Sequence, residues 1–105
     1  MNQEFAMAYR INVPYNGMSV AECAQRTRNA IYQLRWGIPY EGPNGISASV
    51  PISFISWGET FRVVFYQDFF QVESKCAFVL QIIDWGKNRS NVDQFMRCFY
   101  ASALY

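Results

Sequence analysis

The stretch Gln81–Phe95, QIIDWGKNRSNVDQF, carries the chain from an apolar strand through a polar corner into a helix. The apolar run Phe78–Ile83 predicts the strand, and Asp84–Asn88 (DWGKN) forms the corner that follows it. Ser90, with Asp93 three residues later, predicts an N-cap and an acidic first turn, which suits the positive end of the helix dipole. The final helix is therefore expected to fold back onto the sheet directly after its last strand.

A second Trp-Gly corner lies upstream in Ser56–Glu59 (SWGE). A glycine in such a corner permits a positive backbone angle, while the tryptophan supplies a large apolar surface. The sequence therefore predicts that Trp57 and Trp85 cover the sheet ends, with an ion pair from Lys87 to Glu59 or to Asp84. The alternative is a ligand site for a small molecule or a lipid head group, formed by the corner residues Trp57, Glu59, Asp84, Trp85, Lys87 and Asn88.

The first half of the chain predicts one strand and one helix. Apolar residues occupy every second position from Phe5 to Val13, which is typical of a half-buried strand. Ser19 and Glu22 form a capping box, and the apolar spacing that follows predicts a helix over Val20–Trp36. The segment Ile38–Gly45 (IPYEGPNG) is expected to be an irregular connection because it contains two prolines and two glycines.

Three further strands are predicted before the last helix. Alternation over Ile46–Phe54 indicates a strand, with Pro51 favouring an edge or a bulge. The next strand contains Phe61, Val63 and Phe65, and Gln67–Gln71 is expected to turn into a fourth strand from Val72 to about Ile83. The predicted buried stripe of the last helix consists of Val92, Phe95, Met96, Phe99 and Ala103. We therefore expect a single domain over residues 1–105, an α+β two-layer sandwich of order β-α-β-β-β-α, with a four-stranded mainly antiparallel sheet and both helices on one face.

Phe69 and Phe70 are unusual residues for a turn. Either they pack onto the sheet as an extension of the strands, or they form an exposed aromatic pair for a partner or a lipid surface. In the second case Phe69, Phe70 and Tyr66 would form an interface.

Composition excludes several classes of site. The chain has 105 residues, a net charge of +1 and no histidine, so no Ser-His or Cys-His pair and no His-containing metal site is possible. Cys23, Cys76 and Cys98 lie far apart and form no CxxC motif, which predicts reduced thiols in a cytoplasmic protein. Neither a signal peptide nor a transmembrane segment is predicted, although a peripheral membrane contact stays open. We predict no cofactor.

The expected helix–strand–strand–strand–helix order after the first strand is similar to that of a double-stranded-RNA-binding domain. Such domains hold phosphates with a basic cluster at the start of the last helix. Lys87 and Arg89 occupy that position here, but Asp93 and only Arg97 follow them. The near-neutral charge argues against nucleic-acid binding, which is kept as a further alternative.

Several short segments of the chain together resemble an uncharacterised bacterial family with SWGE, SxC and DWGKNxxN motifs. These segments are Ser56–Glu59, Ser74-Lys75-Cys76, Gln81, Asp84–Asn88 and Asn91–Phe95. The resemblance implies a small bacterial domain and no particular activity. This chain departs from it at Phe69-Phe70, where a polar turn would be expected.

The sequence favours a non-enzymatic module that binds a protein partner or itself. We expect the contact to involve a turn or the sheet face that Val64 and Tyr66 share with Arg62. The corner ligand site is the alternative function.

Overall fold

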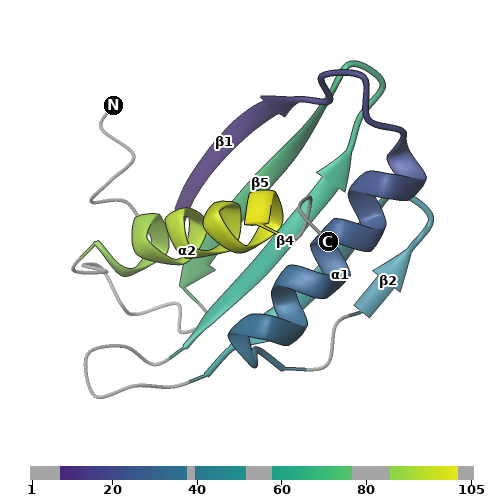
Figure 1. The fold of residues 1–105 in the computed structure, drawn as a ribbon. Helices are drawn as coiled ribbons and strands as arrows, with labels where there is room; N and C mark the ends of the chain where they lie inside the picture. Colours follow the sequence, from purple (N-terminus) through teal and green to yellow (C-terminus); the bar gives the residue numbers. More distant parts are fainter. Residues whose placement is uncertain (1–7, 38–39, 52–57, 77–85, 102–105) are drawn as a thin grey trace.

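In the computed structural model, the residues described are 8–37, 40–51, 58–76 and 86–101. Their elements, in chain order, are β1 (Ala8–Pro14), α1 (Val20–Leu34), β2 (Tyr40–Gly42), β3 (Gly45–Val50), β4 (Glu59–Phe65), β5 (Phe69–Cys76) and α2 (Lys87–Ala101). The five strands form one sheet in the order β1-β5-β4-β3-β2, and every neighbouring pair is antiparallel. Both helices cover the same face of this sheet (Figure 1), so the α+β prediction is confirmed.

The sheet has five strands rather than the predicted four, because part of the expected irregular connection is strand β2. Tyr40 lies opposite Ser47, and Gly42 lies opposite Gly45 across the Pro43-Asn44 turn. The glycines and prolines that suggested a loop therefore build a tight hairpin. Pro51 directly follows β3, whose last residues pair with β4 alone because β2 pairs only with Gly45 to Ser47. The predicted edge position of Pro51 therefore agrees with this end of the strand.

Helix α1 begins as the capping box predicted, with the Ser19 hydroxyl accepting a hydrogen bond from the Glu22 backbone N–H at 3.0 Å. It ends at Leu34, two residues earlier than expected, because Arg35 adopts a left-handed conformation and closes the helix. Beyond the helix end, Gly37 donates its backbone N–H to the Ser49 carbonyl at 2.7 Å, and this hydrogen bond connects the end of α1 to β3.

Helix α2 begins at Lys87, three residues before the predicted N-cap Ser90. The Gly86 carbonyl accepts a hydrogen bond from the Ser90 backbone N–H at 2.9 Å, so Ser90 lies inside the first turn. Gly86 makes the earlier start possible, because its φ of 76° is easily adopted only by glycine. The extra residues place Asn88 on the buried side of the helix.

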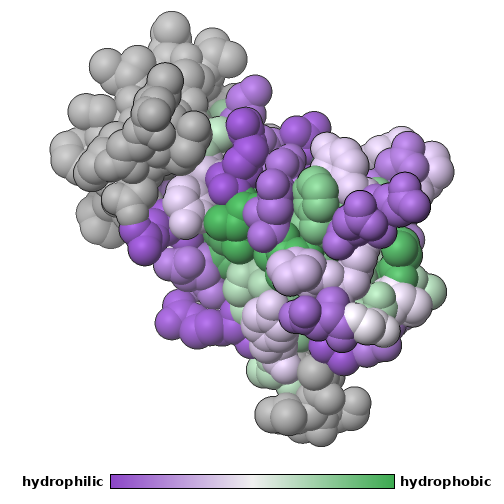
Figure 2. Space-filling model, turned by 90° about the horizontal axis from the view of Figure 1, so that it is seen from above, coloured by the Kyte–Doolittle hydropathy of each residue, from purple (hydrophilic) through white to green (hydrophobic). Residues whose placement is uncertain are grey.

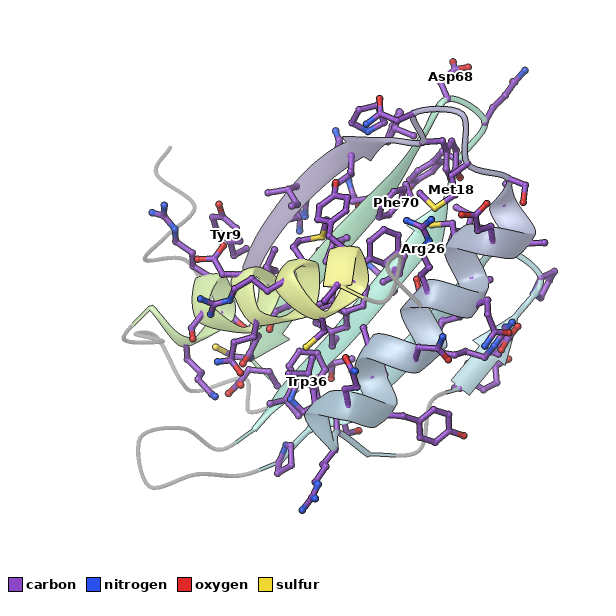
Figure 3. The ribbon with its side chains drawn as sticks, viewed as in Figure 1. Tyr9, Met18, Arg26, Trp36, Asp68 and Phe70 are labelled. Atoms are coloured by element: carbon purple, nitrogen blue, oxygen red, sulfur yellow. The ribbon has the colours of Figure 1, made fainter. Side chains whose placement is uncertain are left out.

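The core lies between the sheet and the helices. Aromatic rings form its centre, with Phe61 4.8 Å from Phe95 and 4.7 Å from Trp36 between ring centroids. Trp36 lies near the C-terminal end of α1 (Figure 3), where it covers this part of the core. Burying each such ring contributes roughly 1.5–3 kcal/mol to stability.

The turn is shorter than the predicted Gln67–Gln71, since only Gln67 and Asp68 lie between the hydrogen-bonded residues Tyr66 and Phe69. Strand β5 begins at Phe69, and Phe70 is completely buried, 5.3 Å from Phe99 between ring centroids. Phe70 points between the sheet and the helices, whereas Asp68 marks the hairpin tip (Figure 3). Of the two alternatives for Phe69 and Phe70, packing onto the sheet is confirmed for Phe70, and the exposed contact is wrong for it, because its ring lies in the hydrophobic core.

No helix in the described part of the chain is both long and apolar enough to cross a membrane.

Gly45 offers a test of the β2–β3 hairpin. A Cβ atom at Gly45 would lie 2.5 Å from the backbone oxygen of Val63, whereas one at Gly42 would meet only the Tyr40 ring, at 3.7 Å. We expect Gly45→Ala to lower the free energy of unfolding by about 1–3 kcal/mol, since β4 backbone must shift. Gly42→Ala is the control and is expected to melt close to the wild type. Urea unfolding measures both, and equal losses would contradict the close approach of β3 to β4.

Cys23 provides a pH test of the helix–sheet packing. Burial raises the pKa of this thiol from 9.0 to about 11, against smaller lowering effects of the Thr27 hydrogen bond and Arg26. Because the folded thiol holds its proton when the unfolded thiol has lost it, the stability contribution is complete below about pH 9 and lost towards pH 11. The stability difference between wild type and Cys23→Ala, measured by urea unfolding, should therefore shrink across that range. A constant difference would contradict the burial of the thiol.

Candidate functional site

Five polar or sulfur-bearing side chains meet in a buried group at one end of the sheet. We call them the polar cluster: Glu59 on β4, Ser74 and Cys76 on β5, and Asn88 and Asn91 on α2. All five are buried, and Glu59 is only 2% exposed. A buried group of this polarity in a small core requires partners for its hydrogen-bonding atoms.

Regular backbone geometry brings the polar cluster together. Glu59 lies directly opposite Cys76 in the antiparallel pair β4–β5, and Ser74 lies two residues before Cys76 on the same strand face. Asn88 and Asn91 are three residues apart and so share one side of α2. Gly58 (φ 93°) and Gly86 (φ 76°) directly precede β4 and α2, the elements that carry Glu59, Asn88 and Asn91.

Hydrogen bonds connect the members in a chain. Asn91 Nδ2 donates to Glu59 Oε1 at 2.6 Å and to Ser74 Oγ at 3.0 Å. Ser74 Oγ donates to Asn88 Oδ1 at 2.8 Å, and Asn88 Nδ2 donates to Cys76 Sγ at 3.4 Å. The network thus joins β4, β5 and α2 through side chains alone.

Two acceptors of the network have no donor. Glu59 Oε2 and Asn91 Oδ1 are both inaccessible to solvent, and neither receives a hydrogen bond from the residues that the structure describes. A buried acceptor without a donor costs about 1–3 kcal/mol, and a charged one costs more. The described residues also contain no group of three or more Cys, Asp or Glu side chains that could hold a metal ion.

The structure brings together only part of the predicted corner site. Glu59 and Asn88 lie in the same network, and Lys87 is half-buried at the start of α2. The predicted ion pair between Glu59 and Lys87 does not form among the described residues, since the Glu59 carboxylate meets Asn91 instead. The remaining three predicted residues lie outside the described ranges: Trp57, Asp84 and Trp85.

Sequence reasoning missed Ser74, Cys76 and Asn91 as members of the cluster. The late helix start assigned to Ser90 left Asn88 outside the helix, so the shared face of the two asparagines was not recognised. Spacing carried a usable signal, because all three belong to the SxC and DWGKNxxN motifs.

The opposite face of the sheet carries a different arrangement, which we call the open face. In the described residues no helix covers it (Figure 1), and its central row runs Arg10, Glu73, Arg62 across β1, β5 and β4. Glu73 Oε2 accepts from Arg10 Nε at 2.8 Å, and Glu73 Oε1 accepts from Arg62 Nη2 at 2.9 Å. The carboxylate side chain is 7% exposed, whereas the arginine side chains are 48% and 52% exposed.

Beside Arg62 the open face is hollowed. The hollow has a volume of about 280 Å³ and is lined by Tyr40, Gly42, Pro43, Asn44, Gly45, Ser47, Arg62 and Val64. Its glycines lack side chains that would fill it, and the exposed ring of Tyr40 lines it on the β2 side. We refer to it as the Tyr40 hollow.

Of the predicted interface residues, only Tyr66 and part of Phe69 lie at the surface. Their ring centroids are 5.1 Å apart at the β4–β5 hairpin, and Tyr66 is 46% exposed. Viewed from the end that carries this hairpin, hydrophobic residues form a small group among hydrophilic ones (Figure 2). This end is therefore mixed in character rather than a large apolar patch.

The chain matches no protein family, no curated protein and no solved structure. The resemblance to a bacterial family with SWGE and DWGKNxxN motifs stays a prediction.

Ser74 is the member whose removal should expose the energetics of the polar cluster. Ser74→Ala takes a donor from Asn88 Oδ1 and an acceptor from Asn91 Nδ2 in a site closed to water. We expect the free energy of unfolding to fall by about 1–3 kcal/mol. Ser49→Ala, at an exposed position on β3, is the control and should change it by less than about 0.5 kcal/mol. Equal small effects in thermal unfolding would show that the network contributes little.

Proposed function

We propose that this domain is a non-enzymatic binding module whose open face receives an acidic segment of a protein partner. The observation that carries the proposal is the pair of half-exposed arginines held in place by one buried carboxylate. Arg10 and Arg62 flank Glu73, so both guanidinium groups are positioned before any partner arrives. Preorganised arginines bind carboxylates well, because their N–H groups match the two carboxylate oxygens and little side-chain freedom is lost.

The balance of charge on the open face favours an anionic partner. Alternation along β1, β5 and β4 places Arg10, Arg62 and Lys75 on this face, with Glu73 as its only carboxylate among the described strand residues. The excess of two positive charges exceeds the net charge of +1 of the whole chain. Pairing two copies through this face would bring like charges together, so the charges favour a different partner over self-association.

The Tyr40 hollow supports an acidic polypeptide over a nucleic acid. Because Arg62 lines it, a carboxylate bound to the arginine would place a neighbouring apolar or aromatic side chain against Tyr40 and Val64. A phosphate backbone would require a longer basic track than these three cations supply. The favoured partner therefore alternates acidic and aromatic residues.

The proposal predicts salt-sensitive binding of a labelled peptide of alternating Glu and Tyr, measured by fluorescence anisotropy. The test variant is Arg10→Gln/Glu73→Gln/Arg62→Gln, which removes all three charges while keeping amide groups that can hydrogen-bond to one another. We expect it to bind the peptide roughly tenfold or more weakly, because the charge-assisted contacts are lost. Arg97→Gln, an exposed arginine on helix α2, is the matched control and should bind as the wild type does.

A second probe of alternating Glu and Ser separates charge from the Tyr40 hollow. Tyr40→Ala should weaken binding of the Glu-Tyr peptide and leave the Glu-Ser peptide unchanged. Unaltered affinity in the triple variant would contradict the proposal. So would tighter binding of single-stranded DNA of the same charge, which would favour a nucleic-acid function instead.

A further inference from the structure

The polar cluster ends in two acceptor oxygens whose orientation is determined by their neighbours. Asn91 Nδ2 donates to Glu59 Oε1 and to Ser74 Oγ, so the amide nitrogen is committed to these two contacts. Turning the amide over would place its oxygen against the Glu59 carboxylate, which offers no donor when ionised. Glu59 Oε2 and Asn91 Oδ1 are therefore the two atoms left without donors among the described residues.

A group that binds these two oxygens must be a hydrogen-bond donor, and positive charge favours its binding. Glu59 is 2% exposed, and the only hydrogen bond that its carboxylate receives from the described residues comes from a neutral amide. Burying a carboxylate in this way is unfavourable unless an opposite charge or further donors accompany it. The site thus has the composition of a cation receptor: one charged oxygen beside one amide oxygen.

Among cations, a primary ammonium group fits these two oxygens best. Its three N–H donors and compact size allow it to reach both acceptors while keeping one donor for a third contact. Ca²⁺ and Mg²⁺ prefer six or more oxygen ligands, and only two donor-free oxygens are present in the described part of the cluster. Two acceptors are sufficient for an amine and insufficient for these metal ions.

We propose that Glu59 Oε2 and Asn91 Oδ1 form a binding site for a primary ammonium group. The site lies on the helix-covered side of the sheet and is independent of the open face. The ammonium comes from a small free amine, because Lys87 forms no ion pair with Glu59 among the described residues. Lys87 is the competing source that the experiment must separate, since it precedes Asn91 by four residues on α2 and residues so spaced share one side of a helix.

Thermal unfolding in the presence of methylammonium chloride tests the proposal. Methylammonium is chosen because both oxygens are closed to solvent and it is the smallest amine with a carbon substituent. Tetramethylammonium chloride at the same concentration is the control, since it has the same charge and no N–H donor. If the site takes a free amine, methylammonium should raise the melting temperature of the wild type by roughly several degrees with rising dose, and tetramethylammonium should not. Glu59→Gln should abolish the rise, while Glu41→Gln, an exposed carboxylate on β2, should retain it.

Lys87→Met distinguishes the two sources of the ammonium. A response in Lys87→Met but not in the wild type would assign the group to Lys87, and a response in both would assign it to a free amine. Should Glu59→Gln fail to fold, the Asn91 side-chain amide signal, followed by nuclear magnetic resonance in wild type and Lys87→Met, provides the readout. The proposal is overturned if neither protein responds, if sodium chloride or tetramethylammonium acts equally, or if Glu59→Gln responds fully.

Discussion

The hydrogen bonds of Asn91 to Glu59 and Ser74 are the contact on which the arrangement of α2 depends. Hydrophobic packing of Phe95 and Phe99 is non-directional and would tolerate a helix rotated or shifted along the sheet. A buried amide with two specific acceptors on β4 and β5 tolerates neither, because any displacement leaves polar atoms without partners. We therefore regard the polar cluster as the device that sets the register between helix and sheet.

The polar cluster also explains why a Trp-Gly pair precedes both β4 and α2 in the sequence. Gly58 and Gly86 both have positive φ, and each directly precedes an element that contributes to the cluster. The corners thus deliver Glu59 and Asn88 to one end of the sheet from segments distant in sequence. The polar cluster can hold the fold together and also bind a ligand. Its hydrogen bonds satisfy most of its polar atoms, and two acceptor oxygens receive no donor from the described residues.

The two sides of the sheet differ in their physical properties. The helix-covered side is rich in aromatic rings, and most of its buried polar side chains in the described residues belong to the cluster. On the open face, Arg10 and Arg62 shield Glu73 while remaining half-exposed themselves. A carboxylate at the centre of this face prevents the arginines from repelling each other and keeps them close together. The face is consequently positive but locally ordered, which suits recognition of a charged partner more than non-specific attraction.

Local patterns in the sequence were sufficient for the α+β class, the alternation of the strands and the capped start of α1 at Ser19. These features depend on neighbours within a few residues, where spacing and capping chemistry act directly. The hairpin β2–β3 was not predicted, because the residues Gly42 to Gly45 have the composition of a loop. Their place in a hairpin depends on the pairing of β3 with β4, which is a tertiary contact. Likewise, a buried glutamate, serine and two asparagines look solvent-exposed in sequence, and only long-range contacts between β4, β5 and α2 reveal their shared site. Tertiary structure alone decided these points, because burial of a polar group is favourable only when distant partners satisfy it.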